Sequence, residues 1–135
     1  MGQPDDFKSH IGWEGPEQMH IVEAGQLRRF AEANADDDPR WLQVAPPTFA
    51  VTLLQEPPAF PPALGYGVGW LNAGDHFEYM NAIRLGDQLR VRSRLADAYE
   101  KLGSAGPLLF LIFVTEFRNQ HDELAIKHTG TRIRR

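Results

Sequence analysis

The chain has 135 residues, of which 42% are hydrophobic and 24% are charged, and its formal net charge is −4. This length and composition suit one globular domain, and the acidic balance argues against bulk nucleic-acid binding, which usually requires a basic surplus. Because cysteine is absent, disulfides and thiolate chemistry are excluded, and we expect a cytoplasmic protein.

Residues 1–18 are predicted to be a loose lead-in, because Gly12, Gly15 and Pro16 interrupt any regular element. The first residues are acidic and polar, unlike a signal peptide. The longest apolar run, residues 108–114, is far shorter than the roughly 20 residues that a membrane helix needs. We therefore expect no membrane association, and we place a single domain over residues 19–135.

Two helices are expected in the first half of this domain. A short strand over residues 19–23 leads into an amphipathic helix over residues 24–34, and Asp36 to Asp38 are expected to end it because Asp favours turns. A second, short helix opens at residues 45–49, since proline is tolerated in a first turn. This helix is apolar almost all round, which is typical of a helix buried inside a sheet.

The second half is predicted to form strands after a Pro/Gly-rich connection over residues 57–74. The predicted strands cover residues 76–83, 88–101, 107–119 and 124–133. In the second of these, Leu89, Val91, Ser93, Leu95 and Tyr99 are expected to share one face. The third is apolar on both faces, so we expect it to be covered by the chain's own helix and by a partner subunit.

Residues 33–41 are Ala-Asn-Ala-Asp-Asp-Asp-Pro-Arg-Trp, and this stretch resembles the catalytic segment A-x-G-D-x-N-P-x-H of MaoC-type hydratases and dehydratases. The resemblance to the N-terminal, often non-catalytic domain of that family extends over residues 19–134. It is carried further by residues 27–33, 45–49, 71–79 and 83–87. It implies an α+β class and a single hot-dog fold, in which an antiparallel sheet wraps around a central helix.

In that family the Asp and the His act together on a water or on the β-hydroxyl of an acyl thioester. Asp36 keeps the Asp position, but Trp41 occupies the His position. Because an indole can only donate a hydrogen bond, the site lacks a group that titrates near neutrality. Asp36 is the candidate catalytic residue of this degenerate site; the alternatives are a structural role at the helix end and contact with a partner's site.

The family usually has about one more helix between its catalytic His and the segment that corresponds to residues 45–49. Here residues 41–44 join the two almost directly. The substrate pocket is therefore expected to be remodelled, with room for a bulky acyl group beside Trp41.

Five residues are expected to bind the substrate. They are Trp41, Phe49 and Tyr79, as walls of an acyl tunnel, and Asn72 and Gly74, as polar contacts to a thioester carbonyl. A stripe of Arg90, Arg92 and Arg94 is either a solvated sheet face or a contact for the phosphates of coenzyme A. No His, Asp or Glu group has the spacing of metal ligands, so we expect no metal.

The resemblance implies a non-catalytic or weakly catalytic subunit of an (R)-specific 2-enoyl-CoA hydratase or 3-hydroxyacyl thioester dehydratase. It further implies an acyl-CoA thioester as the substrate, with no cofactor beyond the coenzyme A of that substrate. We expect a homodimer or a heteromer with a catalytic hot-dog subunit. Two alternatives stay open: an acyl-CoA binding module without turnover, and a hot-dog thioesterase with Glu56 as the activating carboxylate.

Overall fold

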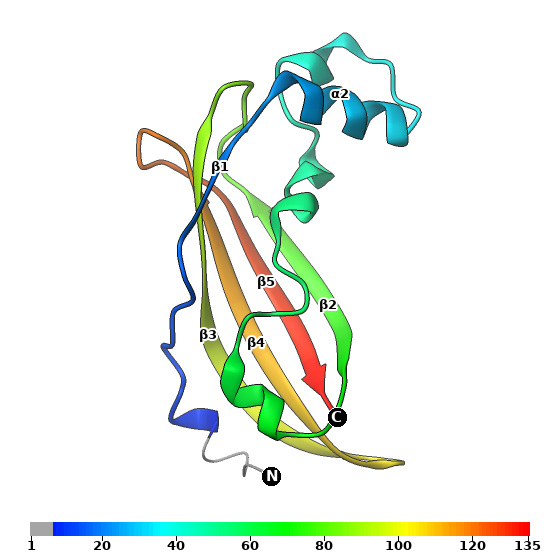
Figure 1. Ribbon diagram of the computed structural model, residues 1–135, viewed down its shortest axis with the longest axis vertical. Coiled ribbons are helices and arrows are strands. Elements are labelled where there is room, and N and C mark those ends of the chain that lie inside the picture. Colours follow the sequence, from blue (N-terminus) through cyan, green and yellow to red (C-terminus); the bar gives the residue numbers. More distant parts are fainter. Residues whose placement is uncertain (1–6) are drawn as a thin grey trace.

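The structure is a computed structural model that describes residues 7–135, and its main element is one curved, five-stranded antiparallel sheet (Figure 1). The strand order is β1-β3-β4-β5-β2. The strands are β1 (Gln18–Ile21), β2 (Trp70–Tyr79), β3 (Gln88–Gly103), β4 (Gly106–Arg118) and β5 (Leu124–Arg134). The predicted α+β class and antiparallel sheet are confirmed.

The helices of the described residues differ from the two that the sequence predicts. The α-helix α2 (Ala24–Ala33) lies at one end of the molecule (Figure 1). Three short 3-10 helices follow: η1 (Pro39–Leu42), η2 (Pro47–Leu53) and η3 (Pro61–Gly65). The predicted central helix is η2, and the chain after it continues across the concave side of the sheet without helical structure as far as η3.

The acidic cluster does not end α2, contrary to the prediction. The helix ends at Ala33, and the side-chain amide of Asn34 donates a 2.8 Å hydrogen bond to the carbonyl oxygen of Phe30. Ala35 then adopts a left-handed conformation with φ 53°. Asp38 instead begins η1, because its carboxylate accepts a 3.0 Å hydrogen bond from the backbone N–H of Arg40.

The predicted alternation along β3 is wrong beyond Leu95, because the strand contains a bulge. The pairing with β4 shifts between Leu95 and Asp97, so Leu95 and Ala98 are both fully buried in the core. Tyr99 therefore points to the opposite face, where its ring stacks on Phe110 of β4 at 5.0 Å. A period-2 count cannot find such a bulge, since every residue after it changes face.

Strand β2 begins at Trp70, six residues earlier than predicted. The pairing of β2 with β5 runs from Trp70 opposite Arg134 to Tyr79 opposite Ile126 and is interrupted by a shift between Asn72 and Gly74. Gly74 has φ +143°, which residues with a side chain rarely adopt. Gly74, which was expected to belong to the connecting loop, is therefore part of a bulge within a strand.

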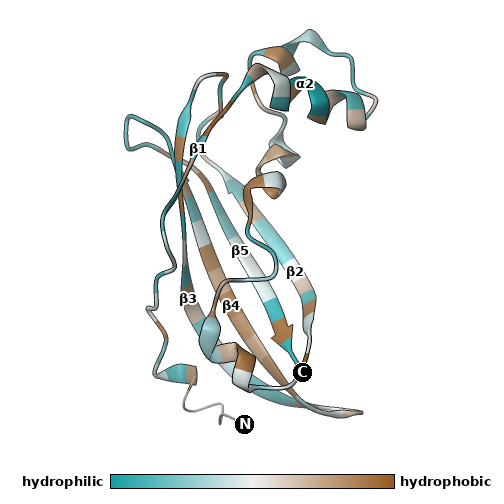
Figure 2. Cartoon of the chain, in the orientation of Figure 1, coloured by the Kyte–Doolittle hydropathy of each residue, from teal (hydrophilic) through white to brown (hydrophobic). Residues whose placement is uncertain are grey.

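The concave face of the sheet carries two apolar clusters. Hydrophobic residues are frequent along β4 (Figure 2). One cluster joins α2 and η2 to one end of the sheet through Leu27, Phe49 and Phe117. The other joins η3 and Phe7 to the opposite end through Phe60, Leu95 and Leu111. Inward-facing side chains between the two clusters are polar, and they form the second of the two sites described below.

Candidate functional site

Asp36 and Trp41 lie together in the loop that follows α2. The indole N–H of Trp41 donates a 2.7 Å hydrogen bond to one carboxylate oxygen of Asp36, and the backbone N–H of Asp38 donates a 3.1 Å bond to the other. Arg40 lies over the Trp41 ring at 4.9 Å from its centroid. The pairing of positions 36 and 41 is thus kept, but the group at 41 has no lone pair with which to accept a proton.

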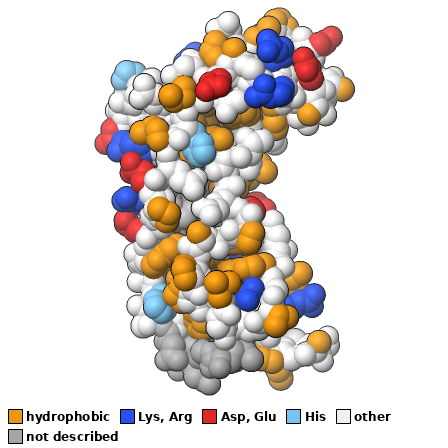
Figure 3. Space-filling view, viewed as in Figure 1, with side chains coloured by type: hydrophobic (Ala, Val, Ile, Leu, Met, Phe, Trp, Pro, Cys, Tyr) orange, Lys and Arg blue, Asp and Glu red, His pale blue; other side chains and the backbone are white. Residues whose placement is uncertain are grey.

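A hollow lies beside Trp41, where the shortened connection predicts room for an acyl group. It is a hollow of about 310 Å³ whose walls include Trp41, Pro46, Tyr79 and Ile83. Asp36 lines a different hollow, together with Arg28 and Leu42. Figure 3 shows the molecule hollowed on one side, below the end that carries α2. Residues 36 and 41 therefore contact each other without facing one common cavity.

The predicted binding residues other than Trp41 do not lie together in one site. Phe49 is buried in the core, where its ring packs edge-on against Phe30 at 5.6 Å. Tyr79 is half exposed and stacks on Phe77 at 6.0 Å. Asn72 and Gly74 line neither hollow; they belong to a polar cluster around Arg132 on β5.

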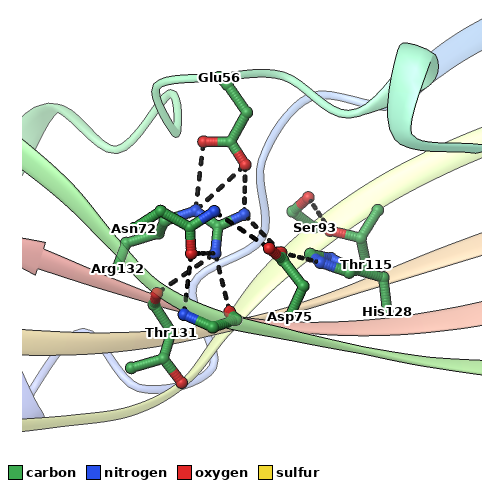
Figure 4. Close-up of polar contacts among 9 residues, drawn as sticks. Glu56, Asn72, Asp75, Ser93, Thr115, His128, Thr131 and Arg132 are labelled. Carbon is green, nitrogen blue, oxygen red and sulfur yellow. Dashed lines mark hydrogen bonds and ion pairs between the residues drawn. The ribbon is translucent and has the colours of Figure 1, made fainter.

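Arg132 is the centre of this cluster, and the residue is only 4% exposed (Figure 4). It forms an ion pair with Glu56 from the segment that crosses the concave face, and a second with Asp75 of β2 at 2.8 Å. Its third nitrogen donates to the side chain of Asn72 and the carbonyl oxygen of Gly74, both at 3.1 Å. The cluster thereby ties the crossing segment to strands β2 and β5.

The cluster also controls the ionisation of Asp75. Partial burial alone would raise the pKa of Asp75, but hydrogen bonds from Asn72, Arg132 and His128 outweigh it and lower the pKa from 3.8 to about 2. Burial likewise opposes the charge on Arg132, and the two carboxylates overcome it and raise the pKa of Arg132. At neutral pH the ion pair of Asp75 with Arg132 is therefore fully charged.

His128 also belongs to this cluster, although its spacing in the sequence does not link it to any acidic partner. It is 3% exposed, and its Nε2 lies 2.6 Å from a carboxylate oxygen of Asp75. Burial lowers the pKa of His128 more than the contact with Asp75 raises it, which favours the neutral form of the ring. Asp75 and His128 are 53 positions apart in the sequence, so no local pattern links them. The register of β2 with β5 brings them together.

Acidic partners compensate most of the arginine stripe on the outer face of β3. Arg90 pairs with Asp122, and Arg92 pairs with Glu14 at 3.2 Å. Glu116 and Arg118 of the neighbouring strand also pair with each other. These contacts favour the solvated sheet face over a phosphate site, because few of the cations remain free to bind a ligand.

Within residues 7–135 the structure contains no group of three or more potential ligands that could hold a metal ion. Over the same range, no helix is both long and apolar enough to cross a membrane.

The curved antiparallel sheet with a helical segment on its concave face defines a hot-dog protein. A family model described as "FAS1-like, dehydratase domain region" matches residues 9–128. The chain belongs to this family of FAS1-like dehydratase domains. No curated protein sequence matches it.

Solved structures of similar fold include enzymes and two-component complexes. R-hydratase PhaJ1 from Pseudomonas aeruginosa is 17% identical, with a TM-score of 0.66, over 92% of this chain and 80% of that one. The HadBC (3R-hydroxyacyl-ACP dehydratase) complex from Mycobacterium tuberculosis is 22% identical, with a TM-score of 0.72 and coverages of 92% and 96%. A chain of the ChsH1-ChsH2 complex from the same organism is 14% identical, with a TM-score of 0.77. The match covers 96% of this chain and 87% of that one. These likenesses confirm the predicted hot-dog fold.

Proposed function

We propose that this chain is the non-catalytic or weakly catalytic subunit of an (R)-specific 2-enoyl-CoA hydratase or 3-hydroxyacyl thioester dehydratase in the cytoplasm. Its partner is a second hot-dog subunit that carries the intact Asp–His pair. In this assembly the chain shapes the acyl pocket and stabilises the active subunit. The acyl-CoA thioester is the substrate, and its coenzyme A is the only coenzyme involved.

The hydrogen bond between Trp41 and Asp36 carries this proposal. Hydration of an enoyl thioester needs a base that takes a proton from water. Both oxygens of Asp36 already accept hydrogen bonds from the loop itself, one from the Trp41 indole and one from the Asp38 backbone. The residue in the His position cannot take up a proton at all. The loop is therefore held together without the histidine that would share the activation of water with Asp36.

The free edge of the sheet supports a partner subunit. Strand β2 ends the sheet, and within residues 7–135 no other strand pairs with its outer side. Exposed apolar side chains lie along and next to this edge: Val68, Leu71, Tyr79 and Met80. An unpaired strand edge flanked by apolar side chains is a template for pairing with another chain. HadBC and ChsH1-ChsH2, which share the fold, are themselves complexes.

The structure weakens the thioesterase alternative. The candidate carboxylate of that reaction, Glu56, forms an ion pair with Arg132 through both of its oxygens. A carboxylate whose two oxygens both contact a buried guanidinium is held in place by that contact and is less free to orient a water. The binding module without turnover remains the alternative that the assay below separates.

The test is co-purification of this chain with an intact Asp–His hot-dog protein encoded beside it, followed by hydration assays on crotonyl-CoA. We expect no turnover by this chain alone, a stable complex, and a changed rate or acyl preference of the partner in the complex. Turnover by the chain alone would overturn the non-catalytic role, and release of free CoA would favour the thioesterase. If mixing changes neither oligomeric state nor activity, the partner role fails.

A matched pair of variants locates the interface. Leu71→Arg places a charge on the free edge of β2, whereas Leu102→Arg places one on the exposed hairpin between β3 and β4. We expect Leu71→Arg to weaken the complex at least tenfold and Leu102→Arg to leave it unchanged, as measured by titration with the partner. Equal effects of the two variants would place the interface elsewhere.

A further inference from the structure

The guanidinium of Arg132 is fixed by the sheet on two of its three sides. Its Nη1 donates to the carbonyl oxygens of Gly74 and Thr131, at 3.1 and 3.2 Å, and to the side chain of Asn72. Its Nη2 donates to the carboxylate of Asp75 at 2.8 Å. These partners belong to β2 and β5, so the two strands hold the plane of the guanidinium whatever group lies on its remaining side.

The remaining side of the guanidinium faces Glu56 (Figure 4). Nε of Arg132 donates to both carboxylate oxygens of Glu56, at 3.1 and 3.2 Å, and Nη2 donates to one of them. The Arg132 side chain is 5% exposed, whereas the Glu56 side chain is 45% exposed. A half-exposed side chain thus covers the last donors of a buried cation, and a carboxylate that replaced it would reach the same Nε and Nη2.

The segment that carries Glu56 has little polar attachment to the sheet. Within the described part of the chain, no backbone hydrogen bond joins residues 55–59 to a strand. Buried Phe60 fixes the far end of this stretch, and a 3.0 Å hydrogen bond between the side chains of Gln18 and Gln55 fixes the near end. Glu56 can therefore leave the guanidinium without breaking any backbone pairing.

A cavity of about 50 Å³ adjoins this contact, and both Glu56 and Arg132 line it. Gly130 lies beside Arg132 on the same face and contributes no side chain, which leaves the space open. The walls include the apolar side chains of Trp13, Leu54 and Phe113. One water needs about 10–15 Å³ of such space, so the cavity takes about three to five groups of that size. It therefore suits a short alkyl chain of about three carbons.

The charges of the cluster favour a ligand with a single negative charge. Two carboxylates, those of Glu56 and Asp75, already share the guanidinium of Arg132. A monocarboxylate that replaces Glu56 keeps this balance, and it keeps the bidentate geometry in which a guanidinium binds a carboxylate. A phosphate dianion would instead add a second negative charge next to Asp75, where like charges repel.

We propose that Arg132 and the adjoining cavity form a binding site for a short-chain monocarboxylate, in which Glu56 is the internal substitute for the ligand. The ligand carboxylate takes the place of the Glu56 carboxylate, and its alkyl chain enters the cavity. Glu56 then moves into solvent, so occupancy of the site releases the middle of the crossing segment from the sheet. None of the lining residues comes from residues 36–41, and the site requires neither a thioester nor a partner subunit.

The test titrates the full chain with butyrate and follows the ¹H–¹⁵N resonance of the Arg132 Nε–H group. Glu56→Gln removes the competing carboxylate and leaves Asp75 to balance Arg132. We expect butyrate to shift this resonance in a saturable way and to bind the variant about tenfold more tightly than the wild type, because a tethered carboxylate competes at high effective concentration. Glu32→Gln removes the same charge from an exposed position on α2 and should bind like the wild type.

The length of the alkyl chain separates a built site from a general effect of anions. Each methylene that enters the cavity should tighten binding about fourfold, the factor that corresponds to about 0.8 kcal/mol per buried CH₂. Butyrate should therefore bind the Glu56→Gln variant about fifteenfold more tightly than acetate, which lacks two of these groups. Inorganic phosphate should produce no saturable shift.

Three results would overturn the site: equal affinities of butyrate and acetate, a comparable shift with phosphate, or equal affinities of the wild type and Glu56→Gln. If Glu56→Gln fails to fold, the wild-type chain decides. Butyrate should then move the ¹³C resonance of the Glu56 carboxylate to that of an exposed glutamate, and an unchanged resonance would refute the displacement. None of these measurements involves turnover, so failure of the site is distinguishable from failure of the proposed function.

Discussion

The indole N–H of Trp41 lies 2.7 Å from a carboxylate oxygen of Asp36, so the residue in the His position still contacts the acid with which a histidine would pair. The contact holds the two residues of the loop together, although an indole cannot take up a proton as a histidine can. Under the proposed function, the chain keeps the loop without the titrating partner of Asp36.

A double-mutant cycle measures the strength of this contact. We expect Trp41→Phe and Asp36→Ala to be coupled by about 0.5–1 kcal/mol of unfolding free energy, because the bond involves a charged acceptor but lies near solvent. The measurement is chemical denaturation of the two single variants and the double variant. A coupling near zero would mean that the indole and the carboxylate do not hold the loop.

Arg132 is expected to be the most sensitive charged residue of the fold. Arg132→Met leaves Glu56 and Asp75 without their cation and should cost about 2–4 kcal/mol, slightly less than a fully buried pair because both carboxylates are partly exposed. The matched control is Arg94→Met on the outer face, where we expect less than about 0.5 kcal/mol. Similar costs for the two variants, measured by urea unfolding, would show that the cluster does not anchor the crossing segment.

Gly130 is expected to resist even the smallest side chain. A Cβ at this position would lie 2.8 Å from Cε1 of His128 and 2.9 Å from Nη1 of Arg132, and both groups are held by hydrogen bonds. Gly130→Ala should therefore destabilise the chain by about 1–3 kcal/mol. Gly65→Ala, where a Cβ meets nothing within 4 Å, is the control and should be nearly neutral. A neutral Gly130→Ala would mean that the two side chains can move apart.

The lowered pKa of Asp75 predicts a loss of stability in acid. Above about pH 4 the carboxylate is ionised in both the folded and the unfolded chain, and its contribution is fully present. As the pH falls from about 4 towards 2, the unfolded chain takes up the proton first, so this contribution disappears. We expect a loss of about 1–2 kcal/mol over this range, after allowing for the partial exposure of the group.

The comparison for this prediction is Asp75→Asn, which should be less stable at neutral pH and flatter between pH 4 and 2. Exposed Asp37→Asn serves as the control and should follow the wild-type curve. Parallel curves for the wild type and Asp75→Asn, from unfolding midpoints measured at each pH, would show that another carboxylate governs the acid transition.

The sequence alone determined the pattern of strands, the position of the Asp–Trp pair and the family. These features depend on local information: alternation along β3 and β5, proline and glycine at chain turns, and an ordered set of short motifs. The alternation of apolar and polar residues could not reveal the bulges at Asn72–Gly74 and Leu95–Asp97. A bulge is a shift in the pairing with the neighbouring strand, and the sequence of one strand does not show that pairing. Sequence spacing therefore placed Tyr99 on the wrong face and began β2 too late.

Only the tertiary structure decided which polar residues meet. Asp75, His128, Arg132 and Glu56 come from three separate segments of the chain, and nothing in their local sequences links them. The register of β2 against β5 and the path of the crossing segment over the concave face bring them into contact. The fold then shifts the pKa values of these groups. Burial lowers the pKa of His128, and hydrogen-bond donors around Asp75 lower the pKa of that carboxyl. The position of Asp36 beside Trp41 could be predicted from the sequence, whereas a buried guanidinium beside a cavity depends on long-range packing.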